Sequence, residues 1–134
     1  MKNIFSRKTL RYIAVICLSC LCIVIGALWL VMQPTPEEKE LIEIAEVYCL
    51  AITSEDTLKD AWELTDKNYD EAVFLAPPAA STEGVRREKI GPAEIHGESG
   101  IVGVTRYYDS DEKKESFIFF NKVDGQWKIE LPGK

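Results

Sequence analysis

The chain has a single histidine, His96, so any acid–base chemistry that needs an imidazole must use it. It stands directly before Gly97 in a stretch typical of a hairpin turn, where we expect an exposed residue. Beyond an apolar N-terminal stretch the chain has one cysteine, Cys49. One histidine and one such cysteine give neither the ligand spacing of a zinc site nor the partners of a serine or cysteine nucleophile. We therefore predict no catalytic residue, no metal site and no cofactor.

Carboxylates are the other side chains that could hold a metal or move a proton. Asp109, Asp111 and Glu112 surround one serine, but the row lacks the glycine and the distal glutamate of a calcium loop. A solvated hairpin tip accounts for this row. A second set of acids lies on or near a short helix: Asp60, Asp66 and Asp70. Its spacing fits an exposed helical face as well as an acid pair in a cavity, so the sequence selects no pair.

Aromatic side chains are numerous and could line a ligand pocket. The pocket candidates are Tyr48, Trp62, Tyr107, Phe119 and Trp127. On a strand, Phe117 and Phe119 point one way and Phe120 the other, which indicates a sheet that is partly apolar on both faces. Such faces more often form core, or an interface with a second copy or a partner protein, than a ligand site.

Two of these pocket candidates, Tyr48 and Trp62, fall in segments that are predicted as helices. Thr35 followed by proline, with Glu38 three residues on, predicts a capped helix start. The apolar spacing then predicts an amphipathic helix over 36–53, in which Cys49 borders the buried face as a structural thiol. A second helix is expected over 57–64, and Asn68 could cap one further turn.

The other candidates, Tyr107, Phe119 and Trp127, fall in segments that are predicted as strands. After an irregular loop over 76–84 the apolar period changes toward two, with turn signals at short intervals. The predicted strands are 86–95, 101–108, 116–123 and 126–131, joined as an antiparallel meander, with Pro92 marking a bulge or an edge in the first. Helices followed by strands predict an α+β fold, with the helices packed on one face of the sheet.

The N-terminal segment has a different composition. Residues 12–32 contain no charge, and about 20 helical residues cross a hydrocarbon core of roughly 30 Å. Four basic residues precede this segment: Lys2, Arg7, Lys8 and Arg11. They predict a cytoplasmic N-terminus, and Trp29 suits the opposite interface. A cleaved signal peptide usually has a shorter apolar region, so we favour a membrane anchor, with processing near Ala27 as the alternative.

Three further cysteines, Cys17, Cys20 and Cys22, lie within the apolar segment. A lipid-modified cysteine would need a leucine and small residues in the positions before it. Cys20 follows Cys17-Leu18-Ser19, and Cys22 follows Leu21, so both match poorly. We therefore interpret these cysteines as small apolar residues of a membrane helix.

The predicted organisation has four parts. Residues 1–11 form a basic cytoplasmic tail, 12–32 a transmembrane helix, 33–36 a linker and 37–134 an extracytoplasmic domain. Removing the four N-terminal basic residues from the 16 Lys and Arg leaves 12 against 22 Asp and Glu, a net charge of about −10 for the remainder. Such a domain repels phosphate backbones, so we expect no nucleic-acid partner.

Two phrases of the domain resemble a known group. They are Ala61-Trp62-Glu63-Leu64 in the second helix and Asp124-Gly125-Gln126-Trp127-Lys128-Ile129 in the last hairpin. With the order of elements, they are similar to extracytoplasmic NTF2-like (cystatin-like) domains, in particular to the bacterial family DUF4878. The resemblance implies a curved sheet around the long helix and a cone-shaped cavity used for ligands, dimer contacts or catalysis. It carries over no catalytic residue.

Three functions are compatible with this organisation. The first is a membrane-anchored binding module in the cell membrane that takes a partner protein, a second copy or a small ligand. The second is a small enzyme, a hydrolase or isomerase, which needs a buried carboxylate or an inward histidine beside a cavity. The third is a structural subunit of an envelope complex. We expect the first.

Overall fold

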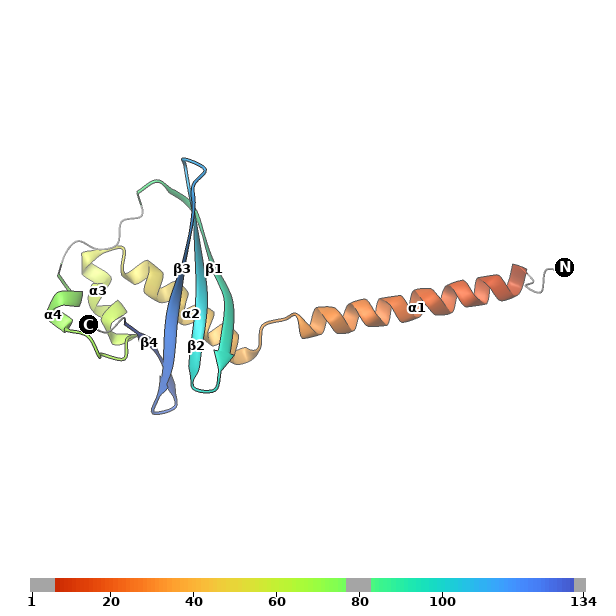
Figure 1. The fold of residues 1–134 in the computed structure, drawn as a ribbon, viewed down its shortest axis with the longest axis horizontal. Helices are drawn as coiled ribbons and strands as arrows, with labels where there is room; N and C mark the ends of the chain where they lie inside the picture. Colours follow the sequence, from red (N-terminus) through yellow and green to blue (C-terminus); the bar gives the residue numbers. More distant parts are fainter. Residues whose placement is uncertain (1–6, 77–82, 132–134) are drawn as a thin grey trace. The chain divides into compact units, whose positions relative to one another are not determined.

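The computed structural model describes residues 7–76 and 83–131, and Figure 1 shows the arrangement of their elements. The chain divides into two compact units, Met1–Gln33 and Pro34–Lys134. Most of the loop expected over 76–84 lies outside the described residues.

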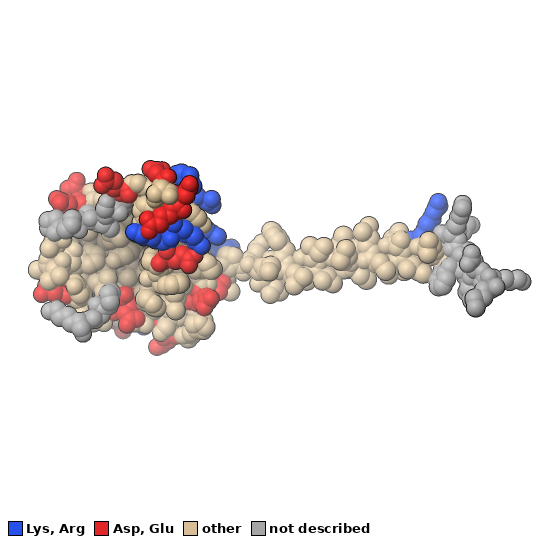
Figure 2. Space-filling view, turned by 45° about the horizontal axis from the view of Figure 1, so that its top comes forward, with Lys and Arg blue, Asp and Glu red and all other residues tan. Residues whose placement is uncertain are grey.

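The first unit contains one helix, α1 (Arg7–Val31). Within its stretch Thr9–Val31, an 18-residue window has a mean hydropathy of 2.8, and the side chains of the whole stretch are exposed. Figure 2 shows it as a run of uncharged residues with a basic side chain near its N-terminal end. By length and composition α1 is therefore a candidate membrane span, although a signal sequence has the same properties.

The second unit begins with the long helix α2 (Pro36–Ala51). The predicted cap is confirmed: the Thr35 hydroxyl accepts from Glu38 N, and the Glu38 carboxylate accepts from Thr35 N at 2.6 Å. These two bonds satisfy donors that a helix start otherwise leaves open. The helix ends two residues before the predicted Thr53, because the chain turns at Ile52, whose N–H still donates to Tyr48 O.

Two short helices follow. The predicted second helix is a 3₁₀ turn (Glu55–Thr57) that leads into α3 (Leu58–Glu63). The helical turn α4 (Glu71–Phe74) is capped by Asp70, whose carboxylate accepts from Ala72 N. The prediction that Asn68 caps this turn was wrong, because the Asn68 side-chain amide donates to Asp66 instead.

The strands form one antiparallel sheet in the order β1-β2-β3-β4: β1 (Val85–His96), β2 (Ser99–Tyr108), β3 (Lys113–Val123) and β4 (Gln126–Glu130). β1 lies at an edge and its register shifts between Ile90 and Ala93, as Pro92 predicts. β3 starts three residues earlier than expected, because Tyr108 N donates to Glu112 O and closes a tight hairpin. β4 ends one residue early.

The core lies between α2 and one face of the sheet. Its buried centre consists of Leu41, Ala45, Val102, Phe120, Trp127 and Ile129. Alternation places the neighbours of Phe120 on the opposite face, where Phe117 and Phe119 are 62% and 48% exposed. The observed architecture is therefore the predicted α+β fold, with the long helix packed on a curved antiparallel sheet (Figure 1).

Candidate functional site

The third and fourth strands differ in length. β3 has 11 residues and β4 has 5, and β4 pairs with β3 only from Phe119 to Val123. The first half of β3, Lys113–Ile118, therefore has no described strand on its outer side. We call this edge of the sheet, which none of the described strands covers, the open edge.

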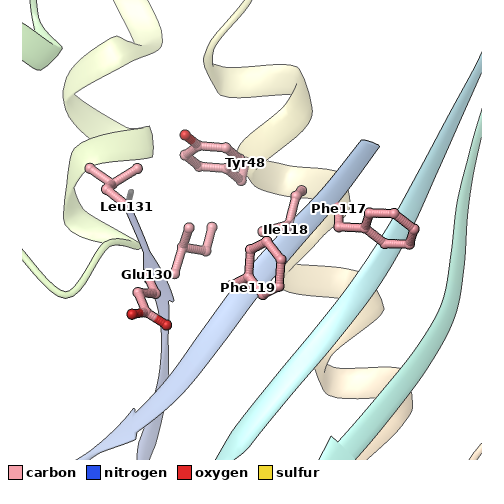
Figure 3. A pocket seen from close by; sticks show the side chains of 7 residues that line it. Tyr48, Phe117, Ile118, Phe119, Glu130 and Leu131 are labelled. Atoms are coloured by element: carbon pink, nitrogen blue, oxygen red, sulfur yellow. The ribbon is translucent and has the colours of Figure 1, made fainter. Parts of the chain in front are cut away.

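A hollow of about 450 Å³ lies at the junction of the open edge and the end of β4. Its lining comprises Tyr48, Phe117, Ile118, Phe119, Ile129, Glu130 and Leu131 (Figure 3). Ile118 belongs to the helix face of β3, whereas Phe117 and Phe119 belong to the opposite face. The hollow thus includes both faces of the sheet edge, as expected where a neighbouring strand is missing.

Two polar groups border this hollow. Burial raises the pKa of the Tyr48 hydroxyl, with a smaller contribution from Cys49, so that hydroxyl stays protonated at neutral pH. Figure 3 shows the Glu130 carboxylate at the other side of the hollow, pointing away from Tyr48. Glu130 is exposed, and no basic side chain of the described residues forms an ion pair with it. The lining is otherwise apolar.

A second hollow of about 270 Å³ lies on the exposed face of the sheet. It is lined by Pro92, Glu94, Ile101, Gly103, Phe117 and Phe119. Gly103 lies directly opposite Phe117 in the register, so the absence of a side chain there leaves space beside the ring. The two phenylalanines therefore stand between the two hollows.

Polar groups also meet under the C-terminal half of α2. Arg106 Nε donates to the Glu88 carboxylate at 2.5 Å, joining β2 to β1. Burial, and then the charge of Glu88, raise the pKa of the nearby Cys49 thiol to about 11, while Arg106 acts in the opposite direction. A thiol of this kind is protonated and unreactive at neutral pH, so the group is structural.

The five predicted pocket residues lie in three places. Tyr48 and Phe119 line the first hollow. Trp62 and Trp127 are buried, each 4% exposed, and Trp62 contacts the ring of Phe74. Tyr107 lies under the Arg87 guanidinium, 5.7 Å from its ring centroid. Ile118, Ile129, Glu130 and Leu131 were not predicted to line a pocket, although the alternation of apolar residues through Leu131 was visible in the sequence.

The other residues considered for chemistry lie at the surface. The His96 side chain is 74% exposed at the end of β1, and Asp109, Asp111 and Glu112 form the tip of the β2–β3 hairpin. Within 7–76 and 83–131, no three His, Cys, Asp or Glu side chains come together as a metal site would require. The hollow beside the open edge is therefore the best developed candidate site.

A long helix across a curved antiparallel sheet, with shorter helices at its end, defines the NTF2-like class of α+β folds. A solved structure shares it: a Campylobacter jejuni protein, provisionally described as an NTF2-like transpeptidase, matches 73% of this chain and 100% of its own at 18% identity and a TM-score of 0.50. At this identity the likeness shows the fold alone. No family model and no curated protein matches the chain.

Proposed function

We propose that this chain is a single-pass membrane protein of the DUF4878 type, whose extracytoplasmic NTF2-like domain binds an apolar ligand group in the hollow beside the open edge. The N-terminus is cytoplasmic, because the four basic residues that precede the uncharged stretch 12–32 favour that side of the membrane. The domain then carries a net charge of about −10 outside the cytoplasm, from 12 Lys and Arg against 22 Asp and Glu.

The hollow is the observation that supports binding. Its lining is mostly aliphatic and aromatic, and its two polar groups, Tyr48 and Glu130, lie on opposite sides. Apolar concave surfaces with few polar groups favour binding of apolar groups, whereas acid–base catalysis needs a desolvated, suitably paired titratable group. The centre of the space between α2 and the sheet, where the family resemblance implied a cavity, is filled by core side chains such as Leu41 and Phe120. The hollow opens at the margin of this space, beside Tyr48 of α2.

The membrane part of the proposal is tested by thiol labelling. In sealed right-side-out vesicles we expect Glu55→Cys to react with a membrane-impermeant maleimide, and Asn3→Cys to react only after permeabilisation. The background is a chain with Cys17, Cys20 and Cys22 replaced by alanine. Mass spectrometry of the membrane fraction should show the full 15.1 kDa chain plus the introduced changes. Labelling in the reverse order, or a shorter chain lacking α1, contradicts the anchor.

The hollow is tested with the neutral fluorescent probe N-phenyl-1-naphthylamine. We expect the full chain in nanodiscs to bind it above the nanodisc background, and Phe119→Ser to weaken binding about tenfold, because a half-exposed phenylalanine contributes roughly 1–2 kcal/mol to such a contact. Val123→Ser is the matched control: Val123 is 44% exposed on the same face of β3 but lies outside the hollow. Equal effects of both substitutions, or none, would exclude the hollow.

A further inference from the structure

The open edge of β3 exposes backbone groups as well as side chains. Lys122 N donates to Glu98 O, and Tyr108 N donates to Glu112 O. In the β2–β3 register these bonds place the backbone groups of the even-numbered β3 residues toward β2. The N–H and C=O groups of Lys113, Glu115 and Phe117 therefore point outward, where no described strand pairs with them.

We propose that the ligand of the hollow is an extended segment of a partner protein, which pairs with the open edge as an added strand and places apolar side chains in the hollow. This rests on the proposed function, because it uses the same hollow. A lipid chain or another small apolar molecule cannot satisfy a row of outward N–H and C=O groups, whereas a peptide strand can. The hollow also lies beyond the end of β4 along the edge of β3, so side chains of the added strand that lie nearest β4 would enter it.

A second copy of the chain is a poor occupant of the open edge. In a symmetric antiparallel pair that joins the outward groups, one residue must lie opposite its own copy. Glu115 in that position sets two carboxylates face to face, which is destabilising. Lys114 in that position sets two lysines face to face and joins only residues 113–115 of each copy, because β3 begins at Lys113. Ser116 in that position would place Lys113 of the second copy opposite Phe119. Glu130 of β4 already pairs with Phe119 on that side. The partner is therefore a different protein.

Charge defines the partner segment further. At the hairpin end of the open edge the lysines already have acidic neighbours: Lys113 Nζ lies 2.5 Å from Glu115, and Lys114 Nζ 3.7 Å from Glu112. At the other end Glu130 has no described ion-pair partner. A lysine or arginine beside the apolar residues of the segment would meet this carboxylate within an acidic domain. The segment is thus extended, apolar at alternate positions and basic at one end.

The test uses a fluorescein-labelled peptide, Arg-Thr-Val-Thr-Val-Thr-Val amide, with the full chain in nanodiscs and anisotropy as the readout. Two further peptides carry N-methyl groups on alternate residues. One is methylated at its odd-numbered residues and the other at its even-numbered residues. In a paired strand, the backbone N–H groups of only one of these two sets of residues face β3. We therefore expect one methylated peptide to lose at least about tenfold in affinity and the other to bind like the parent. Equal binding of both methylated peptides overturns strand pairing.

Two variants of the chain locate the contact. Glu115→Pro removes an outward N–H without touching the bonds to β2, and should weaken the peptide about tenfold while circular dichroism stays unchanged. Glu130→Gln should weaken it several-fold at low salt and reduce its salt dependence, whereas Glu94→Gln, a carboxylate on β1, should not. Unchanged affinity in Glu115→Pro contradicts the proposal.

The outcomes separate this inference from the proposed function. If the naphthylamine probe binds in a Phe119-dependent way and the peptide does not bind, the hollow is a site and strand pairing is wrong. If neither binds, both proposals fail. A symmetric dimer that crosslinks through Lys114→Cys would show that the open edge is used by a second copy, which also overturns the inference.

Discussion

Replacing Phe120 by alanine should destabilise the domain by about 3–5 kcal/mol, a large part of the 5–15 kcal/mol that holds a typical domain together. Phe120 is 1% exposed and packs in the cluster between α2 and the sheet. Its removal takes the ring from its contacts and leaves a cavity that β2 and α2 can fill only in part. Urea unfolding of the full chain in nanodiscs, followed by tryptophan fluorescence, measures the change.

Phe117→Ala is the matched control for this substitution. Phe117 lies on the same strand and has the same side chain, but it is 62% exposed on the opposite face. Its truncation should change the free energy of unfolding by well under 1 kcal/mol. Similar losses for the two variants would mean that the faces of β3 are not divided between core and surface as described.

The domain should lose about 2 kcal/mol of stability between pH 9 and pH 11 because of Cys49. The thiol has an ordinary pKa of 9.0, and burial raises it to about 11 in the folded chain. The folded state therefore favours the protonated thiol. The stabilisation is complete below pH 9, where both states are protonated, and is lost as the pH rises through the folded value. Burial of Tyr48 acts in the same direction.

Urea unfolding at several pH values checks this dependence. Cys49→Ala removes the titrating group, so its stability should fall less steeply over the same pH range, whatever its stability at pH 7. All other titratable groups are the same in both proteins, so their contributions cancel in the comparison. Parallel curves for the two proteins would show that Cys49 does not titrate as a buried group.

The sequence predicted those parts of the fold that local chemistry determines. The capping box at Thr35 and Glu38 needs only four consecutive residues, and it formed as expected. The alternation of Trp127 and Ile129 likewise identified the buried face of the last strand. The cap of α4 was missed because Asn68 and Asp70 are both good capping residues, and only the path of the chain decides which one is used.

The candidate site was only partly predictable for a different reason. Tyr48 and Phe119 were identified as aromatic residues. The hollow exists, however, because β4 stops at Glu130, opposite Phe119, whereas β3 also includes Lys113–Ile118, which no described strand pairs with on that side. Strand length depends on where the chain turns away in three dimensions. The alternation through Leu131 favoured a β4 that is one residue longer, which by itself leaves most of the open edge without a neighbouring strand. Trp62 and Trp127 were needed in the core instead.

The connection between α1 and α2 is short, and its length determines which partner proteins the domain encounters. Only Met32–Thr35 separate the two helices, and the capping bonds at Thr35 hold the last of these residues. Four residues extend over at most about 14 Å. A chain anchored through α1 would therefore search for partners by lateral diffusion in a thin layer above the bilayer. Proteins fixed in the same membrane would meet it at a far higher effective concentration than freely diffusing ones.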